Sequence, residues 1–154
     1  MKLEEKKEQV WKEYERFKKD YALSLKSNKA FSELVTSIMD ERGYTVEKLC
    51  ELSGIDTRTI YRLRSGKIKN SKGEEREYLP HVKTIIAFSI ACDLDMLMTI
   101  TLLESLGLSF KRTSETHYAY CFLIVNCRGK SIDECNDMLR KLKIDEEYLL
   151  RHSS

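Results

Sequence analysis

The chain has 154 residues, 34% of them charged, with a formal net charge of +2 and only one proline and six glycines. This length suits one domain, or one domain with an appendage, and the scarcity of proline and glycine favours a mainly helical protein. The opening twenty residues are too charged for a signal peptide, and the most apolar stretch, 84–108, is interrupted by three acidic residues. We therefore expect a cytoplasmic protein without a membrane span, whose five cysteines, an odd number, stay reduced.

Residues 3–25 predict one long helix, followed by a break at 27–29. Its apolar residues recur at alternating spacings of four and three, which is typical of a coiled-coil seam. These residues are Val10, Tyr14, Phe17 and Tyr21. Three heptads give only a marginal independent coiled coil, so two interpretations stay open: packing on the main domain, or pairing with a second copy.

Three shorter helices follow. Residues 31–42 have one apolar face, and Gly43 suits the left-handed position that ends such a helix. Thr45 is a good N-cap for the next helix, because its hydroxyl can accept a hydrogen bond from a free amide of the first turn. Gly54 ends that helix. Asp56 caps a third helix that runs to Ser65.

Residues 67–78 read as a polar loop, basic first and then acidic. Pro80 suits the start of a helix that continues towards Leu94. Asp93 or Asp95 can cap a further helix, 96–106. The residues of that helix expected to face the core are Leu97, Ile100, Leu103 and Leu106.

The C-terminal part predicts a helical hairpin. Ser114 caps a helix to Cys127, and Ser131 with Glu134 forms a capping box for a helix to Leu142. The tail after Asp145 is expected to fray. The predicted fold is all-α, divided into an N-terminal amphipathic helix (1–27), a central domain (28–108) and a C-terminal hairpin with its tail (109–154).

Basic residues concentrate between positions 56 and 72. This segment contains six basic residues and one acidic residue, Asp56, so its local charge is +5 on a nearly neutral chain. The six are Arg58, Arg62, Arg64, Lys67, Lys69 and Lys72. A patch of this kind indicates a polyanionic partner.

The segment TVEKLCELSGIDTRTIYRLRSGK, residues 45–67, has the pattern of a helix-turn-helix. Two helices that meet across a tight turn need a small residue there, here Gly54, with a hydrophobic neighbour, here Ile55. The second helix then leaves donors and hydroxyls facing outward, as contacts with base edges require. These outward positions are Thr57, Arg58, Thr59, Tyr61 and Arg62.

This segment resembles the Cro and lambda-repressor-like, or XRE, helix-turn-helix family. The matching residues are Leu49, Cys50, Ser53, Gly54, Ile55, Asp56, Thr59, Ile60, Arg62, Leu63, Gly66 and Lys67. The resemblance extends from Phe31 to about Leu97, and it implies a five-helix domain that binds double-stranded DNA. A bacterial or phage-type transcriptional regulator is therefore expected, acting as a homodimer on paired half-sites.

The resemblance also implies roles for single residues. Helix 56–65 would enter the major groove, with Thr57, Arg58 and Tyr61 facing base edges and Arg62 and Arg64 contacting bases or phosphates. The complete set of expected DNA-binding residues is Thr45, Thr57, Arg58, Thr59, Tyr61, Arg62, Arg64, Lys67 and Lys69.

Phosphate contacts are expected beside the recognition helix as well. Thr45, at a helix N-terminus, would sit against a phosphate. The basic half of the 67–78 loop, including Lys72, would reach the DNA backbone in the manner of a wing.

A second class of function stays open. The same fold can serve as an antitoxin-like or other protein-interaction module, binding a partner through the N-terminal helix or the C-terminal hairpin. Val46 stands where the family commonly has glutamine, and the acidic half of the loop would be repelled by DNA.

Catalysis and cofactors have little support. The sequence has no glycine-rich phosphate loop, no H-E-x-x-H and no G-x-S-x-G motif. His117 and Cys121 lie one helical turn apart, but no C-x-x-C pair accompanies them. We expect neither an enzyme nor a bound metal or cofactor.

Overall fold

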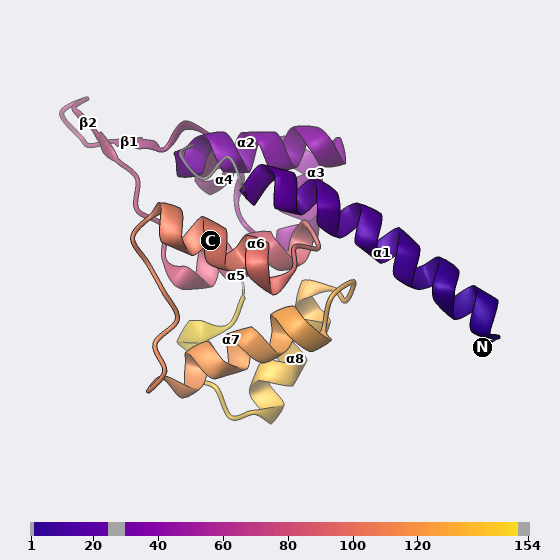
Figure 1. The fold of residues 1–154 in the computed structure, drawn as a ribbon. Coiled ribbons are helices and arrows are strands. Elements are labelled where there is room, and N and C mark those ends of the chain that lie inside the picture. The colour runs from indigo at the N-terminus through magenta and orange to yellow at the C-terminus, as the bar shows by residue number, and fades with distance from the viewer. Residues whose placement is uncertain (1, 25–29, 151–154) are drawn as a thin grey trace.

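A computed structural model describes residues 2–24 and 30–150, and these form helices with one small antiparallel hairpin (Figure 1). The helices are α1 (Leu3–Ser24), α2 (Phe31–Arg42), α3 (Val46–Ser53), α4 (Thr57–Ser65), α5 (Val82–Ala91), α6 (Met96–Ser105), α7 (Glu115–Asn126), α8 (Ile132–Lys141) and the short 3-10 helix η1 (Glu146–Tyr148). The strands are β1 (Lys67–Lys69) and β2 (Glu75–Glu77). The expected break at 27–29 lies outside the described residues.

The predicted N-caps are confirmed. Thr45, Asp56, Asp95, Ser114 and Ser131 each accept a hydrogen bond from the backbone amide three residues further on. Such side chains satisfy a donor that the first helical turn would otherwise leave free. Of the two candidate caps for α6, the structure uses Asp95.

One helix was predicted to begin too early. Pro80 is buried but precedes the helix, and α5 starts at Val82 with His81 as its N-cap residue. The His81 side chain makes no capping hydrogen bond there.

The core is continuous from α2 to the end of the described chain. Its centre is α5, in which every residue from Thr84 to Ile90 is buried, and this helix packs against α3, α6, α7 and α8. A helix that is apolar all round needs such a position, because no face of it can be left in water. The C-terminal hairpin therefore shares its core with the helix-turn-helix.

Two predictions about buried positions are wrong. In α6, Leu97 is exposed, whereas Met98 and Leu102 face the core. The tail does not fray before Leu150: Leu149 and Leu150 are buried, and Asn136 of α8 bonds to the Leu150 backbone.

The segment 67–78 is not an irregular loop but a hairpin. Lys67 pairs with Glu77 and Lys69 with Glu75, so opposite charges lie across from each other. The turn is held by Asn70, whose Oδ1 accepts hydrogen bonds from the amides of Lys72 and Glu74. Three-residue strands carry little periodic signal, which is why the sequence did not reveal them.

Helix α1 projects from the body, and its second half packs beside α6 (Figure 1). Arg16 forms an ion pair with Asp93, at the end of α5, and also donates to the Asp93 carbonyl. The apolar seam of α1 is nevertheless exposed. Within the two described stretches, no helix combines the length and the apolar character needed to cross a membrane.

Candidate nucleic-acid interface

Helices α3 and α4 meet across a turn that buried hydrogen bonds hold. Ser53 Oγ donates to the Leu49 carbonyl at 2.6 Å and accepts from the Ile55 amide at 3.0 Å. Gly54 has a φ of +70°, a left-handed conformation that costs other residues energy. Leu49, Ile55 and Ile60 are all fully buried around this turn, so the angle between the two helices is fixed by packing.

Cys50 of α3 contacts the start of α4. Cys50 Sγ lies 3.4 Å from Thr57 Oγ1. Cys50 is half-buried against the core.

Helix α4 presents a polar and basic face to solvent. Asp56 Oδ1 caps it by accepting from the Thr59 amide at 2.7 Å. Ile60 and Leu63 anchor the opposite face in the core. The exposed side chains of α4 are Thr57, Arg58, Tyr61, Arg64 and Ser65.

The structure corrects one member of the predicted set. Thr59 is only 8% exposed and lies on the core side of α4 with Ile60 and Leu63. Its position follows from helical spacing, because residues four apart share a face, and Leu63 lies four residues after Thr59. Thr59 is therefore not an outward position.

Arg62 lies at the edge of the exposed face and is half-buried. Its charge influences the Tyr78 hydroxyl. Burial raises the pKa of this hydroxyl, the positive charge of Arg62 lowers it, and the negative charge of Asp56 raises it. Arg62 of α4 thus interacts electrostatically with the residue that follows β2.

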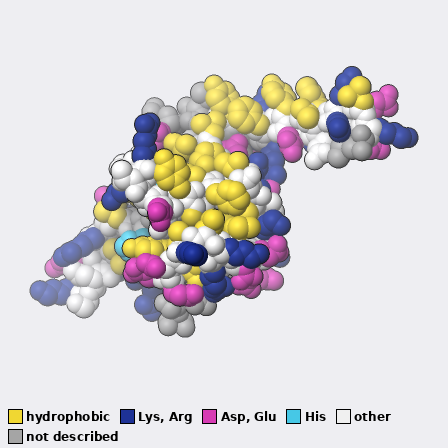
Figure 2. Space-filling view, turned by 90° about the horizontal axis from the view of Figure 1, so that it is seen from below, with side chains coloured by type: hydrophobic (Ala, Val, Ile, Leu, Met, Phe, Trp, Pro, Cys, Tyr) yellow, Lys and Arg dark blue, Asp and Glu magenta, His cyan; other side chains and the backbone are white. Residues whose placement is uncertain are grey.

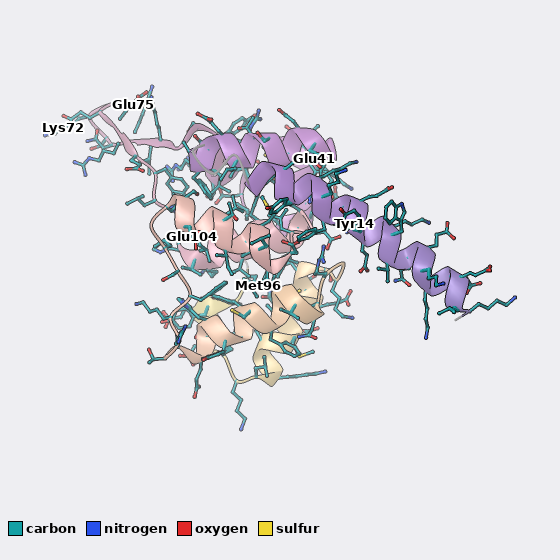
Figure 3. All side chains as sticks on the ribbon, in the orientation of Figure 1. Tyr14, Glu41, Lys72, Glu75, Met96 and Glu104 are labelled. Carbon is teal, nitrogen blue, oxygen red and sulfur yellow. The ribbon has the colours of Figure 1, made fainter. Side chains whose placement is uncertain are left out.

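The hairpin follows α4 directly. The Tyr78 amide donates to the Gly66 carbonyl at 2.8 Å, which ties the end of β2 to the end of α4. Lys67 Nζ lies 3.5 Å from Glu75 Oε2. The expected repulsion of the acidic half is reduced, because the acids neutralise lysines on the same face. Figure 3 shows Lys72 and Glu75 at the far end of the hairpin, away from the body.

The N-terminus of α3 belongs to the same helix-turn-helix. Thr45 is exposed, and its Oγ1 accepts from the Lys48 amide at 3.1 Å. Val46, the residue in the family's glutamine position, is 5% exposed and belongs to the core. A phosphate contact here is left to the Thr45 side chain and the free amides of the first turn.

Sequence reasoning missed two polar residues. Ser65 is exposed on the outward face of α4, and its Oγ accepts from the Lys67 amide at 3.2 Å. Arg76 points to the opposite side of the hairpin from the lysines, together with Ile68. Helical spacing from Arg58 and Tyr61 predicts the position of Ser65, whereas the strand register that places Arg76 has no clear sequence signal.

The cysteines and histidines do not assemble a metal site among the residues described. No group of three or more potential ligands occurs there. Burial raises the pKa of the Cys92 and Cys135 thiols to about 12, so neither is a thiolate near neutral pH.

The capped, rigid α3–turn–α4 unit with a basic outward face defines a helix-turn-helix of the kind that binds nucleic acid. Residues 35–75 match the model of the Cro/C1-type HTH DNA-binding domain family. The match runs from α2 into β2, and α5 and α6 lie beyond it. No curated protein and no solved structure gave a significant match to the chain.

Proposed function

We propose that the chain is a sequence-specific DNA-binding transcriptional regulator of bacterial or phage type, acting in the cytoplasm. The single observation that carries this is the exposed row on α4, centred on Arg58 and Tyr61, within a segment that matches a DNA-binding family. Exposed arginine on a rigid helix can form a forked hydrogen bond to guanine or to phosphate.

In this proposal, α4 lies in the major groove. Thr57, Arg58 and Tyr61 face base edges, and Arg64 contacts a base or phosphate from the flank. Arg62 is assigned a backbone contact, since its half-buried position beside Tyr78 limits its reach. Helices α2 to α6 form the five-helix binding domain.

Phosphate contacts flank the groove. Thr45 and the first turn of α3 meet one phosphate. Lys67 and Lys69 are placed along the DNA backbone, where a phosphate competes with Glu75 and Glu77 for the lysines. Two copies bind paired half-sites about one helical turn apart, so the operator is expected to be pseudo-palindromic.

A protein-interaction role is the second candidate, and a specific observation favours it. Large apolar side chains are exposed on α1 and α7, including Trp11, Tyr118 and Phe122. Exposed apolar groups that gather in a patch mark interaction sites more often than chance. This role is compatible with DNA binding, but it becomes the main function if DNA binding is absent.

Selection from a pool of randomised duplexes tests the proposal. We expect enrichment of one sequence with two related half-sites, and we expect Arg58→Ala to relax the preference at one position of each half-site, with a loss of about 1–3 kcal/mol there. A pool that stays random through repeated selection, with folded protein, would contradict sequence-specific recognition.

A further inference from the structure

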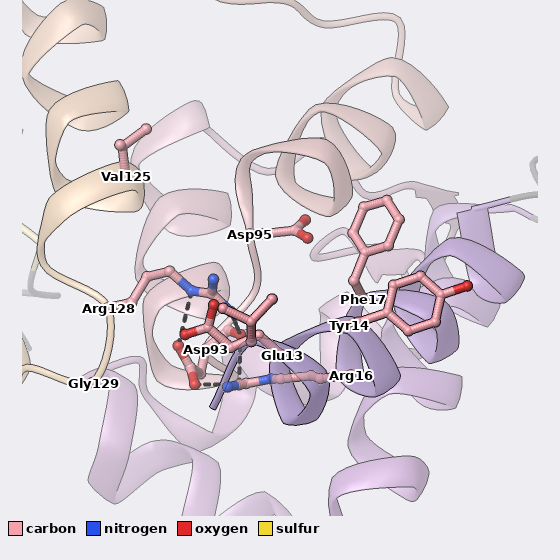
Figure 4. A pocket seen from close by; sticks show the side chains of 10 residues that line it. Glu13, Tyr14, Arg16, Phe17, Asp93, Asp95, Val125, Arg128 and Gly129 are labelled. Atoms are coloured by element: carbon pink, nitrogen blue, oxygen red, sulfur yellow. Dashed lines mark hydrogen bonds and ion pairs between the residues drawn. The ribbon is translucent and has the colours of Figure 1, made fainter. Parts of the chain in front are cut away.

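A groove runs between α1 and the end of α7, with apolar side chains of α1 on one side and Val125 among charged residues on the other (Figure 4). Val10, Tyr14 and Phe17 of α1 form one wall, and Val125 of α7 belongs to the other. Asp93 lies at its base. Val125 is 61% exposed, so this apolar side chain lacks a covering element.

The wall formed by α1 continues along the whole helix as the apolar seam. Five residues at heptad spacing are between 44% and 67% exposed. They are Leu3, Val10, Tyr14, Phe17 and Tyr21. Figure 2 shows hydrophobic side chains along the projecting helix and continuing onto the body. Within this sequence, the segments outside the described ranges have at most five residues, too few to cover a helix of 22.

Two ion pairs to Asp93 join α1 to the end of α7. Arg16 from α1 and Arg128 from the end of α7 both pair with Asp93, and Arg128 Nε lies 3.2 Å from Asp93 Oδ1. Both guanidinium groups also donate to the Asp93 carbonyl. One carboxylate thus joins both sides of the groove, and the apolar seam beside it remains exposed.

We propose that this seam binds the α1 helix of a second copy in antiparallel orientation, with Val10 facing Tyr14 of the second copy across a two-fold axis near Lys12. The projecting first half of each α1 then covers the groove beside α7 of the other copy. A parallel pairing leaves both projecting halves without a body to pack on. Antiparallel pairing gives each half the apolar surface it lacks.

The charges along the seam fit this register. Lys7, the polar residue that interrupts the seam, falls opposite Phe17 of the second copy, where Asp95 lies in the groove (Figure 4). On the flank of the seam, Glu4 falls near Lys18 of the second copy. Glu13 alone falls near its own counterpart, because it lies close to the axis.

The available area is of the right order. An aromatic side chain buries about 150–250 Å² in total. Four of them, the three in the seam and Trp11, are about half exposed, so covering their exposed halves buries roughly 300–500 Å² per copy. A standard interface buries about 800 Å² per partner, and Leu3, Val10 and Val125 supply much of the remainder.

The oligomeric state in the absence of DNA tests this interface independently of the proposed function. At tens of micromolar, light scattering after gel filtration should give about 36 kDa, twice the chain mass of 18.1 kDa. Val10→Lys should weaken association at least about tenfold, since it places a charge in the seam at a position exposed in the single copy. Glu8→Gln, with the same charge change on the opposite side of α1, is the matched control and should leave association unchanged.

Glu13→Gln tests the orientation. In the antiparallel pair it removes a like-charge contact, so association should tighten by up to about fivefold. In a parallel pair Glu13 lies near Lys18 of the second copy, so the same change weakens association. A wild-type mass of 18.1 kDa at these concentrations, or equal association of Val10→Lys and Glu8→Gln, would overturn the interface. Weaker association of Glu13→Gln would overturn the antiparallel arrangement.

Discussion

Asn136 and Leu150 exchange two hydrogen bonds inside the core. The Leu150 amide donates to Asn136 Oδ1 at 2.6 Å, and Asn136 Nδ2 donates to the Leu150 carbonyl at 3.5 Å. That carbonyl lies 3.9 Å from the point where a Cβ on Gly54 would stand. The end of the described chain is thus fastened next to the turn between α3 and α4. The C-terminal helical hairpin therefore packs directly on the helix-turn-helix.

Replacing Asn136 tests this packing. Asn136→Ala leaves a buried backbone amide and carbonyl without their partner, so it should lower the free energy of unfolding by about 1–3 kcal/mol. Asn126→Ala, which removes an exposed side-chain bond to the Phe122 carbonyl, is the control and should change it by less than about 0.5 kcal/mol. Urea denaturation measures both. Equal effects of the two variants would show that the tail contributes no stability.

The N-cap of α4 gives a second prediction. Asp56→Ala removes the acceptor of the Thr59 amide and should cost about 1 kcal/mol. Asp56→Asn keeps an oxygen acceptor and should cost only a few tenths of that. Thermal unfolding followed by circular dichroism compares them, and an Asn variant as unstable as the Ala variant would rule out capping as the role of Asp56.

A comparison of alanine variants at Gly66 and Gly43 distinguishes backbone strain from steric crowding. Both have a left-handed φ, +72° and +66°, so alanine should cost roughly 1–2 kcal/mol at either position. A Cβ at Gly66 would in addition lie 3.2 Å from the Ser32 Cβ, whereas nothing lies within 4 Å at Gly43. Gly66→Ala should therefore be the more destabilising variant in chemical denaturation. A larger loss of stability in Gly43→Ala than in Gly66→Ala would show that the contact with Ser32 costs no measurable stability.

His117 makes stability depend on pH. Burial, together with the Lys111 charge, lowers the pKa of the imidazole in the folded protein. The Lys111 amide donates to His117 Nδ1 at 2.7 Å, which requires the neutral ring. The contribution of His117 is therefore fully present above the pKa of the unfolded chain, about 6.5, and is lost as the pH falls through the lower folded value.

Denaturation curves between neutral and mildly acidic pH measure this dependence. His117→Asn should be less stable at neutral pH, and its stability should fall less steeply towards acid. His81→Asn, which removes an exposed histidine, should retain the wild-type slope. An unchanged slope in His117→Asn would exclude this residue as the cause.

Local chemistry explains which parts of the fold the sequence predicts. Thr45, Asp56 and Ser131 act within their own helix turns, so residue type and spacing suffice to place them. The recognition face follows in the same way from helical period, with Arg58 and Tyr61 outward. Thr59 was misplaced because its hydroxyl suggests a surface residue, while its position in the period puts it on the core side.

The remaining features depend on contacts between distant residues. The burial of Leu149 and Leu150 requires Asn136, and the placement of α1 requires the ion pair of Arg16 with Asp93, 77 residues away. The hairpin depends on a register that three-residue strands do not reveal. No local pattern encodes these pairings, so the sequence predicted fraying, a loop, and two alternatives for α1.

Binding to random-sequence duplex DNA at two salt concentrations tests the central claim most directly. We compare the wild type with Arg58→Ala/Arg64→Ala, which removes two exposed charges from α4 without touching the half-buried Arg62. Arg112→Ala/Lys141→Ala removes the same charge from exposed positions around the C-terminal hairpin and is the matched control. Fluorescence anisotropy should show binding at low salt that weakens steeply as salt rises, because phosphate contacts release counterions. The α4 variant should lose about tenfold or more in affinity, and the control should bind like the wild type. No binding by the folded wild type at low salt, or equal losses in the two variants, would contradict a DNA-reading role for α4.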